Sequence, residues 1–351
     1  MQAVVLHGQE DLRVETVPLP VPCAGEVLLE VRAALTCGTD LKVYRRGYHA
    51  KMLVPPALFG HEVSGRVAAV GAGVTRFAEG QRVVALNSAP CGVCLFCRKR
   101  QPNLCGDLLF NNGAYAEYMR IPARIVEKNM LALPDAVPYE HAALTEPLAC
   151  VVRGFEETGA QAADTFVVVG AGPIGLMFMR VAEIAGCDVI AVVKRREQVA
   201  SAARFGARHI VEITEGVDTV EAVRAFTAEG EGADVVVECV ATSESWQKAV
   251  AMVRKGGVVN LFGGPPSGSV VSFDTNQLHY GDITLKASFH HTPATCRRSF
   301  DLIASGAIHA GDFITSRAQL IEVPDVFKRI TQRDGTGVLH IKTAILPGGA
   351  A

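Results

Sequence analysis

The chain has 351 residues, of which 49% are apolar and 20% are charged. This composition is typical of a globular protein and excludes a disordered one, while the length predicts two domains. Basic and acidic residues nearly balance, at 34 against 36, and no run of lysine and arginine exceeds three residues. The charge pattern therefore gives no reason to expect a nucleic-acid partner.

The sequence carries no signal for export or membrane insertion. No stretch approaches about 18 unbroken apolar residues, and the first residues lack the basic and long apolar regions of a signal peptide. We expect no membrane partner and a cytoplasmic location, where thiols stay reduced. Of the ten cysteines, four lie close together in the sequence, and this clustering indicates metal binding.

Short β-type runs separated by glycine turns dominate the first part of the chain. They occupy residues 1–7, 27–33, 63–70 and 81–86, and they predict a barrel-like β domain. From about residue 150 the pattern changes to strand runs that alternate with helical stretches, which predicts a parallel sheet covered on both faces. These strand runs are expected at 166–169, 188–193, 233–240, 257–262 and 283–287.

The tail from about residue 291 carries two helical stretches and a closing strand at 338–346. We expect this segment to fold back on the N-terminal domain. The expected organisation is therefore a catalytic domain at 1–148, a cofactor domain at 149–290 and a returning segment at 291–351.

Two short motifs in the first domain are candidates for a catalytic metal site. One begins at Cys37, and the other contains His61 and Glu62. A catalytic zinc needs three protein ligands and an open position, and thiolate with imidazole is a common combination. Taken singly, these residues would be a buried thiol, a core histidine and a surface charge. Glu146 lies at the expected domain boundary, where we expect a pocket.

Four cysteines form the strongest motif of the chain, and they are Cys91, Cys94, Cys97 and Cys105. Four thiolates on one loop can complete a tetrahedron around zinc with no open position, which is typical of a structural site. Iron–sulfur clusters use other spacings, and a chance cluster of buried thiols is the remaining alternative.

A glycine-rich turn follows the strand run at 166–169 and opens a helical stretch. Its residues are Gly170, Ala171, Gly172, Pro173, Ile174 and Gly175. Glycines at this spacing let the backbone approach a pyrophosphate at the helix N-terminus, so the turn predicts a dinucleotide site. A tight β–α turn in an unrelated α/β protein is the alternative.

The residues after the second strand favour NADP over NAD. An NAD site usually has an acid there to bind the ribose 2′-hydroxyl, whereas this chain has Lys194, Arg195 and Arg196. These cations could meet a 2′-phosphate. A solvated basic helix start is the other interpretation, although such residues are unfavourable at a helix N-terminus without an anion.

Together these motifs resemble the medium-chain, zinc-containing alcohol dehydrogenase family over essentially the whole chain. Glu146 stands where the alcohol dehydrogenases proper have a second cysteine ligand, so the chain is most similar to the branch with sorbitol (L-iditol) and threonine dehydrogenases. The resemblance implies a GroES-like β-barrel catalytic domain with a structural zinc lobe at about 88–108. It also implies a Rossmann doubly wound parallel-sheet cofactor domain.

The resemblance implies roles for single residues as well. Cys37, His61 and Glu62 would hold a catalytic zinc, and Glu146 would be a fourth ligand or bind the metal's water. Asp40 would support His61. The catalytic site and the four-cysteine lobe together imply two zinc ions per chain. Members of the family are usually dimers or tetramers, so the resemblance also implies a homodimer or homotetramer.

A proton relay is implied too. Thr39 would take the proton of the substrate hydroxyl, and Lys42 would extend the relay outward. The substrate side differs from that of many sorbitol dehydrogenases, which have His where this chain has Lys42. They also have Tyr at Val43, and Arg-Tyr at the His290–His291 pair. Sorbitol itself is therefore not the expected substrate.

Other side chains near the first motif could recognise a substrate. The candidates for the substrate pocket are Tyr44, His49, His290 and His291. Arg45 and Arg46 could bind a sugar acid or sugar phosphate, but a solvated loop is the favoured interpretation.

The sequence thus predicts oxidation of a secondary alcohol of a polyol or sugar-like small molecule to a ketone, with hydride transfer to NADP in preference to NAD. A dehydrogenase of another alcohol class, such as a 3-hydroxy amino acid or a sugar phosphate, is the alternative. A non-catalytic zinc- and nucleotide-binding sensor is a further one.

Overall fold

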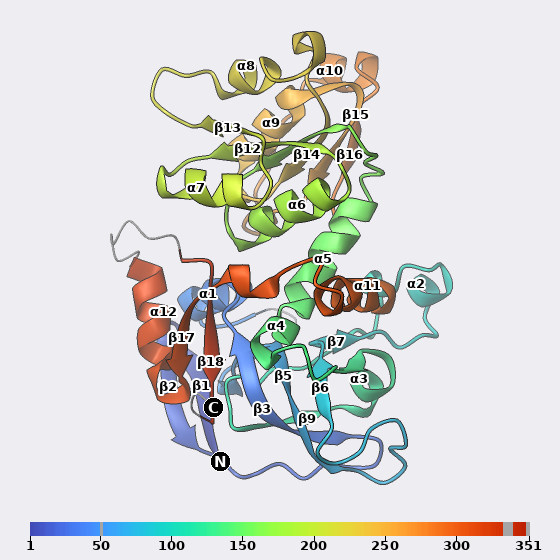
Figure 1. Ribbon diagram of the computed structural model, residues 1–351, viewed down its shortest axis with the longest axis vertical. Helices are drawn as coiled ribbons and strands as arrows, with labels where there is room; N and C mark the ends of the chain where they lie inside the picture. Colours follow the sequence, from blue (N-terminus) through green and yellow to red (C-terminus); the bar gives the residue numbers. More distant parts are fainter. Residues whose placement is uncertain (50–51, 333–339, 349–351) are drawn as a thin grey trace. The chain divides into compact units, whose positions relative to one another are not determined.

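The computed structural model describes residues 1–49, 52–332 and 340–348, and the chain forms two compact units (Figure 1). Unit 1 consists of Met1–Ala149 with His291–Ala351, and unit 2 consists of Cys150–His290. Among the helices of these described ranges, none is long and apolar enough to cross a membrane.

Unit 1 is built around a seven-stranded sheet with β3 near its middle. The strand order is β10-β6-β5-β3-β18-β17, and β9 also pairs with β3. The bounds of these strands are β3 (Val27–Leu35), β5 (Glu62–Val70), β6 (Arg82–Ala85), β9 (Tyr118–Ile121), β10 (Met130–Ala132), β17 (Ile314–Gln319) and β18 (Lys342–Leu346). Two smaller sheets complete the strands of this unit. One contains β1 (Gln2–Gly8), β2 (Asp11–Thr16) and β4 (Ala57–Leu58), and the other contains β7 (Ser88–Ala89) and β8 (Leu109–Phe110).

The C-terminal segment contributes a strand to the N-terminal sheet. In an antiparallel register, Ala344 of β18 faces Leu35 of β3. The closing strand predicted at 338–346 is observed from Lys342 to Leu346, and residues 338 and 339 lie outside the described residues. This pairing brings β18 beside Thr36, which follows β3, and the Thr343 N–H donates to the Thr36 hydroxyl at 2.9 Å.

Short helices connect the strands of unit 1. They are α1 (Gly38–Arg46), α2 (Leu95–Arg98), α3 (Ala123–Lys128), α4 (Tyr139–Ala143), α11 (Pro293–Ala304) and α12 (Val323–Gln332), while α5 (Thr145–Glu156) begins in unit 1 and ends in unit 2. The two helices predicted in the tail are therefore observed as α11 and α12.

An aromatic cluster fills part of the core of unit 1. Phe327 of α12 packs against Phe59, Tyr115 and Tyr44, with ring centroids 5.5 to 6.0 Å apart. Tyr44, predicted for the substrate pocket, is 3% exposed and packs in this core, so its place in a pocket stays a prediction. The reason for this packing is its place on α1, where it shares the inward face with Val43.

Unit 2 is a doubly wound parallel sheet, with strand order β13-β12-β11-β14-β15-β16. These strands are β11 (Thr165–Val169), β12 (Asp188–Val193), β13 (His209–Glu212), β14 (Ala233–Glu238), β15 (Val253–Leu261) and β16 (Thr284–Lys286). Their apolar, β-branched runs are buried because helices cover both faces, as predicted. Helices α6 (Pro173–Ile184) and α7 (Glu197–Arg204) lie on one face, and α8 (Thr219–Arg224) and α9 (Ser243–Met252) lie on the other; α10 (Thr275–Tyr280) precedes β16 (Figure 1).

The strand order reverses between β11 and β14. In such sheets ligands bind at the carboxyl ends of the strands, at the point of reversal. The turn at Gly170–Gly175 follows β11 directly, so it lies at this position.

Candidate functional site

Three side chains of unit 1 converge into a candidate metal centre. One ligand atom each of Cys37, His61 and Glu62 lies within 4.8 Å of the others. Cys37 is the N-cap of α1, and its Sγ accepts a hydrogen bond from the Thr39 N–H at 3.4 Å. His61 precedes β5 and Glu62 begins it, and both are buried. Thiolate, imidazole and carboxylate form a donor set that suits zinc with one position left open.

Asp40 orients His61. On α1 it accepts a hydrogen bond at Oδ1 from His61 Nδ1, at 2.8 Å, and both side chains are about 4% exposed. This contact fixes the ring and leaves Nε2 for a metal. Burial lowers the pKa of His61, but Asp40 and then Cys37 outweigh burial and raise it well above 6.5.

Lys342 is an additional charged residue of the centre. Its Nζ donates to both carboxylate oxygens of Glu62, at 2.7 and 2.6 Å, and to the carbonyl of Thr36 at 2.8 Å. Burial lowers the pKa of Lys342, but the Glu62 carboxylate outweighs that effect and raises it above 10.5. Burial also raises the pKa of Glu62, and the Lys342 charge opposes that effect. The close contact with both carboxylate oxygens therefore offsets part of the cost of burying the Glu62 charge.

Glu146 is buried at the start of α5 and lies outside this group of three ligand atoms. Burial raises the pKa of its carboxyl to about 7. Its Oε1 is 3.6 Å from Nε2 of His291, which hydrogen-bonds to Asn87 Oδ1 at 3.0 Å. Because Nε2 donates to the Asn87 oxygen, Nδ1 of His291 accepts from the thiol of Cys296, 3.1 Å away.

The four-cysteine lobe forms a second cluster in unit 1. One sulfur each of Cys91, Cys94, Cys97 and Cys105 lies within 4.8 Å of the others. Hydrogen bonds from the backbone N–H groups of Cys97 and Gly106 lower the pKa of Cys94 to about 6, whereas burial raises that of Cys97 to about 12. The thiols therefore do not all ionise by themselves at neutral pH. A divalent cation would supply the missing stabilisation, and the donor set fits a structural zinc.

The dinucleotide turn of unit 2 has the backbone that its glycines predict. Gly170 has φ +100°, and a Cβ on Gly175 would lie 1.8 Å from the Gly170 carbonyl oxygen. Pro173 and Ile174 begin α6 behind the turn. Buried Gln198 connects the turn to the residues after β12, because its Nε2 donates to the Ala171 carbonyl at 3.1 Å while its Oε1 accepts from the Arg195 N–H at 3.1 Å.

The three predicted cations stand at the carboxyl end of β12. Lys194 and Arg196 are exposed, and Arg195 forms an ion pair with Glu197 at 3.3 Å. Arg196 is the N-cap position of α7 and makes no side-chain capping bond. These residues follow β12, the strand that pairs with β11 ahead of the glycine turn. A ribose phosphate of a bound dinucleotide is expected near this end of the sheet.

Comparison with known proteins identifies the family. The alcohol dehydrogenase GroES-like domain matches residues 23–135, and the zinc-binding dehydrogenase model matches residues 173–305. The chain is 31% identical to the sorbitol dehydrogenase of Bacillus subtilis over 339 residues, which cover 95% of this chain and 94% of that protein. The chain belongs to the medium-chain zinc-containing alcohol dehydrogenase family.

Two further comparisons agree with this membership. The dehydrogenase is 34% identical to the L-threonine 3-dehydrogenase of Bacillus licheniformis over 328 residues, 92% of each chain. The structure of a zinc-binding dehydrogenase from Sinorhizobium meliloti bound to NADP superposes with a TM-score of 0.88 at 30% identity, covering 99% of each chain. The predicted fold class, a GroES-like domain with a Rossmann domain, is confirmed. The protein is an oxidoreductase of alcohols that uses NAD(P), and zinc is the metal of its family.

Most of the remaining residues predicted for the catalytic relay and the substrate pocket lie at different positions of unit 1. Thr39 is half-buried and Lys42 is exposed, both on α1 beside Cys37. His49 lies beyond α1, where its Nδ1 accepts a hydrogen bond from the Met52 N–H at 3.0 Å. His291 is 2% exposed and contacts Glu146, Asn87 and Cys296 within unit 1, and its place in a substrate pocket stays a prediction.

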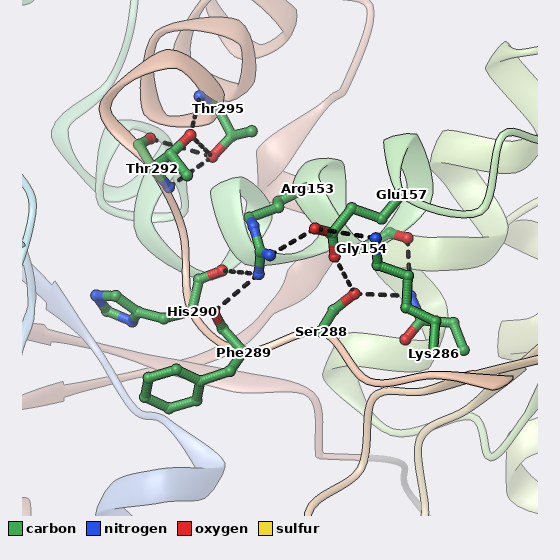
Figure 2. Close-up of polar contacts among 10 residues, drawn as sticks. Arg153, Gly154, Glu157, Lys286, Ser288, Phe289, His290, Thr292 and Thr295 are labelled. Atoms are coloured by element: carbon green, nitrogen blue, oxygen red, sulfur yellow. Dashed lines mark hydrogen bonds and ion pairs between the residues drawn. The ribbon is translucent and has the colours of Figure 1, made fainter. Parts of the chain in front are cut away.

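The backbone of His290 is held by Arg153. Figure 2 shows the Arg153 guanidinium donating to the carbonyls of Phe289 and His290, at 2.8 and 3.2 Å. Glu157 accepts from the same guanidinium and from the Ser288 hydroxyl. His290 has φ +66°, an uncommon value for a residue with a Cβ, and these bonds stabilise it.

Lys342, Tyr115 and Gln198 were not predicted as site residues. Lys342 lies in a largely apolar closing run, and the single lysine there was the available signal that it needs a buried partner. No local pattern marks Tyr115 or Gln198, because their roles depend on contacts with residues distant in sequence or across a turn.

Proposed function

We propose that this dehydrogenase oxidises a secondary alcohol of a polyol or sugar-like molecule to the ketone, and that it prefers NADP to NAD. The observation that carries the proposal is the convergence of Cys37, His61 and Glu62 within 4.8 Å, beside Thr39. The reaction would remove a hydride with both electrons from the carbinol carbon, and a bound nicotinamide would supply the acceptor. The hydroxyl proton leaves to the protein, so the alcohol is oxidised and NADP⁺ is reduced.

Cys37, His61 and Glu62 would hold the catalytic zinc, with Glu146 able to bind it or its water. When bound, zinc supplies a Lewis acid that lowers the pKa of the substrate hydroxyl, and the nicotinamide supplies the hydride acceptor. Asp40 keeps His61 in its metal-binding orientation. The Thr39 hydroxyl accepts the substrate proton and passes it outward toward exposed Lys42, one helical turn further along α1.

Cys91, Cys94, Cys97 and Cys105 would hold a second, structural zinc, giving two ions per chain. The turn with Gly170, Gly172 and Gly175 would hold the cofactor's pyrophosphate. Lys194, Arg195 and Arg196 would bind the 2′-phosphate of NADP. The relative from Sinorhizobium meliloti, which binds NADP, supports this choice. We also propose that the active protein is a homodimer or homotetramer, which light scattering of the purified protein tests.

A second candidate is a 3-hydroxy amino acid as substrate. The L-threonine 3-dehydrogenase relative is 34% identical to this chain, against 31% for the sorbitol dehydrogenase, and this observation favours keeping the alternative. Turnover with a panel of polyols, sugar phosphates and L-threonine, measured by the absorbance of the reduced nicotinamide, separates the two candidates.

Cofactor titration tests the NADP preference. We expect NADP to bind at least about tenfold more tightly than NAD, equivalent to about 1.4 kcal/mol. Replacing Lys194 and Arg196 by alanine should weaken NADP binding and leave NAD unchanged, while Arg204→Ala at the far end of α7 serves as a control. Equal or tighter binding of NAD by the wild-type protein would contradict the preference and make these cations a solvated helix start.

A further inference from the structure

Tyr115 lies in the core of unit 1, and its side chain is fully buried. Its hydroxyl is 2.7 Å from Oδ2 of Asp40 and 3.1 Å from the carbonyl oxygen of Leu35. One hydroxyl proton cannot serve both acceptors fully, and the shorter, charge-assisted contact to the carboxylate takes it. Burial, and then the Asp40 charge, raise the pKa of Tyr115 well above 10, so the hydroxyl keeps its proton and donates.

Asp40 thereby links two donors. Its Oδ2 accepts from Tyr115, and its Oδ1 accepts from Nδ1 of His61 at 2.8 Å. With Asp40 and His61 each 3% exposed, water has little access to this chain of hydrogen bonds. Two bonds on opposite oxygens fix the rotation of the carboxylate about its Cβ–Cγ bond, and a fixed carboxylate holds the imidazole in one orientation.

The backbone places Tyr115 beside His61. The Tyr115 N–H donates to the carbonyl of Phe59 at 2.9 Å, and the N–H groups of Gly113 and Ala114 donate to that of Gly60. Gly60 has φ +88°, and a Cβ there would lie 2.8 Å from atoms of the Tyr115 ring. The ring therefore lies directly over Gly60, the residue before His61. This packing restricts the ring and so holds its hydroxyl next to Asp40.

We infer that Tyr115 is a positioning residue, whose hydroxyl holds Asp40 and through it sets how firmly His61 retains the catalytic metal. The inference rests on the proposed zinc site at Cys37, His61 and Glu62. Loss of the hydroxyl leaves Oδ2 of Asp40 without this donor, so the carboxylate rotates more freely and His61 tilts away more often. Partners that contact a metal-binding histidine directly change metal affinity about 10- to 100-fold, and Tyr115 is one bond further away.

The test is the rate of zinc release from the zinc-loaded protein to a chromogenic chelator. Zinc release from the wild-type protein should have a kinetic phase that is absent in Cys37→Ser, and this phase is assigned to the catalytic site. In Tyr115→Phe, this phase should be about three- to tenfold faster, and the visible absorption bands of the cobalt-substituted protein should shift. Tyr118→Phe, which removes a hydroxyl from β9 of the same unit, should change neither.

A double-mutant comparison shows whether Tyr115 acts through Asp40. In an Asp40→Asn background, Tyr115→Phe should have little further effect on zinc release, because the carboxylate that it positions is gone. Unchanged release and cobalt bands in Tyr115→Phe, with only a lower melting temperature, would overturn the inference and leave Tyr115 a packing residue. If the wild-type protein had no release phase sensitive to Cys37→Ser, the zinc site itself would be contradicted.

Discussion

Lys342, near the C-terminal end of the chain, holds both carboxylate oxygens of Glu62 at 2.6 and 2.7 Å in a buried ion pair. Their sequence separation is 280 residues, and the antiparallel pairing of β3 with both β18 and β5 brings them together. The same carboxylate belongs to the candidate metal centre. Glu62 therefore has a buried cationic partner in the metal-free protein, and the strength of this pair is measurable.

Replacing Lys342 by methionine should destabilise the metal-free protein. Breaking a buried pair by removing one partner costs about 3–5 kcal/mol, because the other charge is left buried and uncompensated. Glu62→Gln combined with Lys342→Met should recover much of the lost free energy of unfolding, since neither charge remains. Urea unfolding of the four proteins measures the cycle. Additive losses, or a loss below about 1 kcal/mol in Lys342→Met, would show that the pair is not a strong buried interaction.

Glu146 should make the metal-free protein less stable as pH rises. Burial raises the pKa of its carboxyl to about 7, against 4.5 ordinarily, so between these values the folded state binds a proton that the unfolded state has lost. Stability therefore falls with rising pH across this window, by up to roughly 3 kcal/mol at about 1.4 kcal/mol per pKa unit.

Glu146→Gln removes this titration. Its free energy of unfolding should match that of the wild-type protein near pH 4.5 and exceed it increasingly up to about pH 7, where the advantage levels off. Denaturant unfolding at a series of pH values, after zinc removal, makes the comparison. A constant difference between the two proteins across this range would mean that Glu146 does not titrate there.

Cys97→Ser should remove the structural zinc. Zinc content should fall by about one ion per chain, and the melting temperature should fall by roughly 5 °C or more, because the lobe loses a ligand and its thiols cannot all ionise. Cys23→Ser, which changes an exposed cysteine outside the lobe, is the control and should alter neither quantity. A melting temperature and zinc content equal to those of wild type would contradict a structural site in the lobe.

Local patterns predicted much of the fold. The apolar runs that became β11 and β12 have lengths and flanking glycines that suit only buried strands in this context, and the four cysteines lie on one short loop. The turn at Gly170 follows from backbone sterics, which are local. Such features depend on neighbours along the chain and can therefore be recognised in a sequence.

The remaining site depends on distant contacts. Tyr44 is adjacent to the catalytic motif in sequence but faces the core, because the helical turn of α1 points it toward Phe327. Lys342 reaches Glu62 only through strand pairing, and Tyr115 reaches Asp40 only across a core contact. Spacing along the chain cannot show which face of a short helix is buried or which strand pairs with which.

The most direct test of the proposed catalytic centre is Cys37→Ser, assayed for turnover, zinc content and melting temperature together with Cys97→Ser. We expect Cys37→Ser to lose about one zinc ion per chain and all turnover with every alcohol of the panel, while the fold stays intact. Cys97→Ser should instead lose stability along with its zinc. Substantial turnover in Cys37→Ser would contradict the assignment of Cys37, His61 and Glu62 as the catalytic metal site.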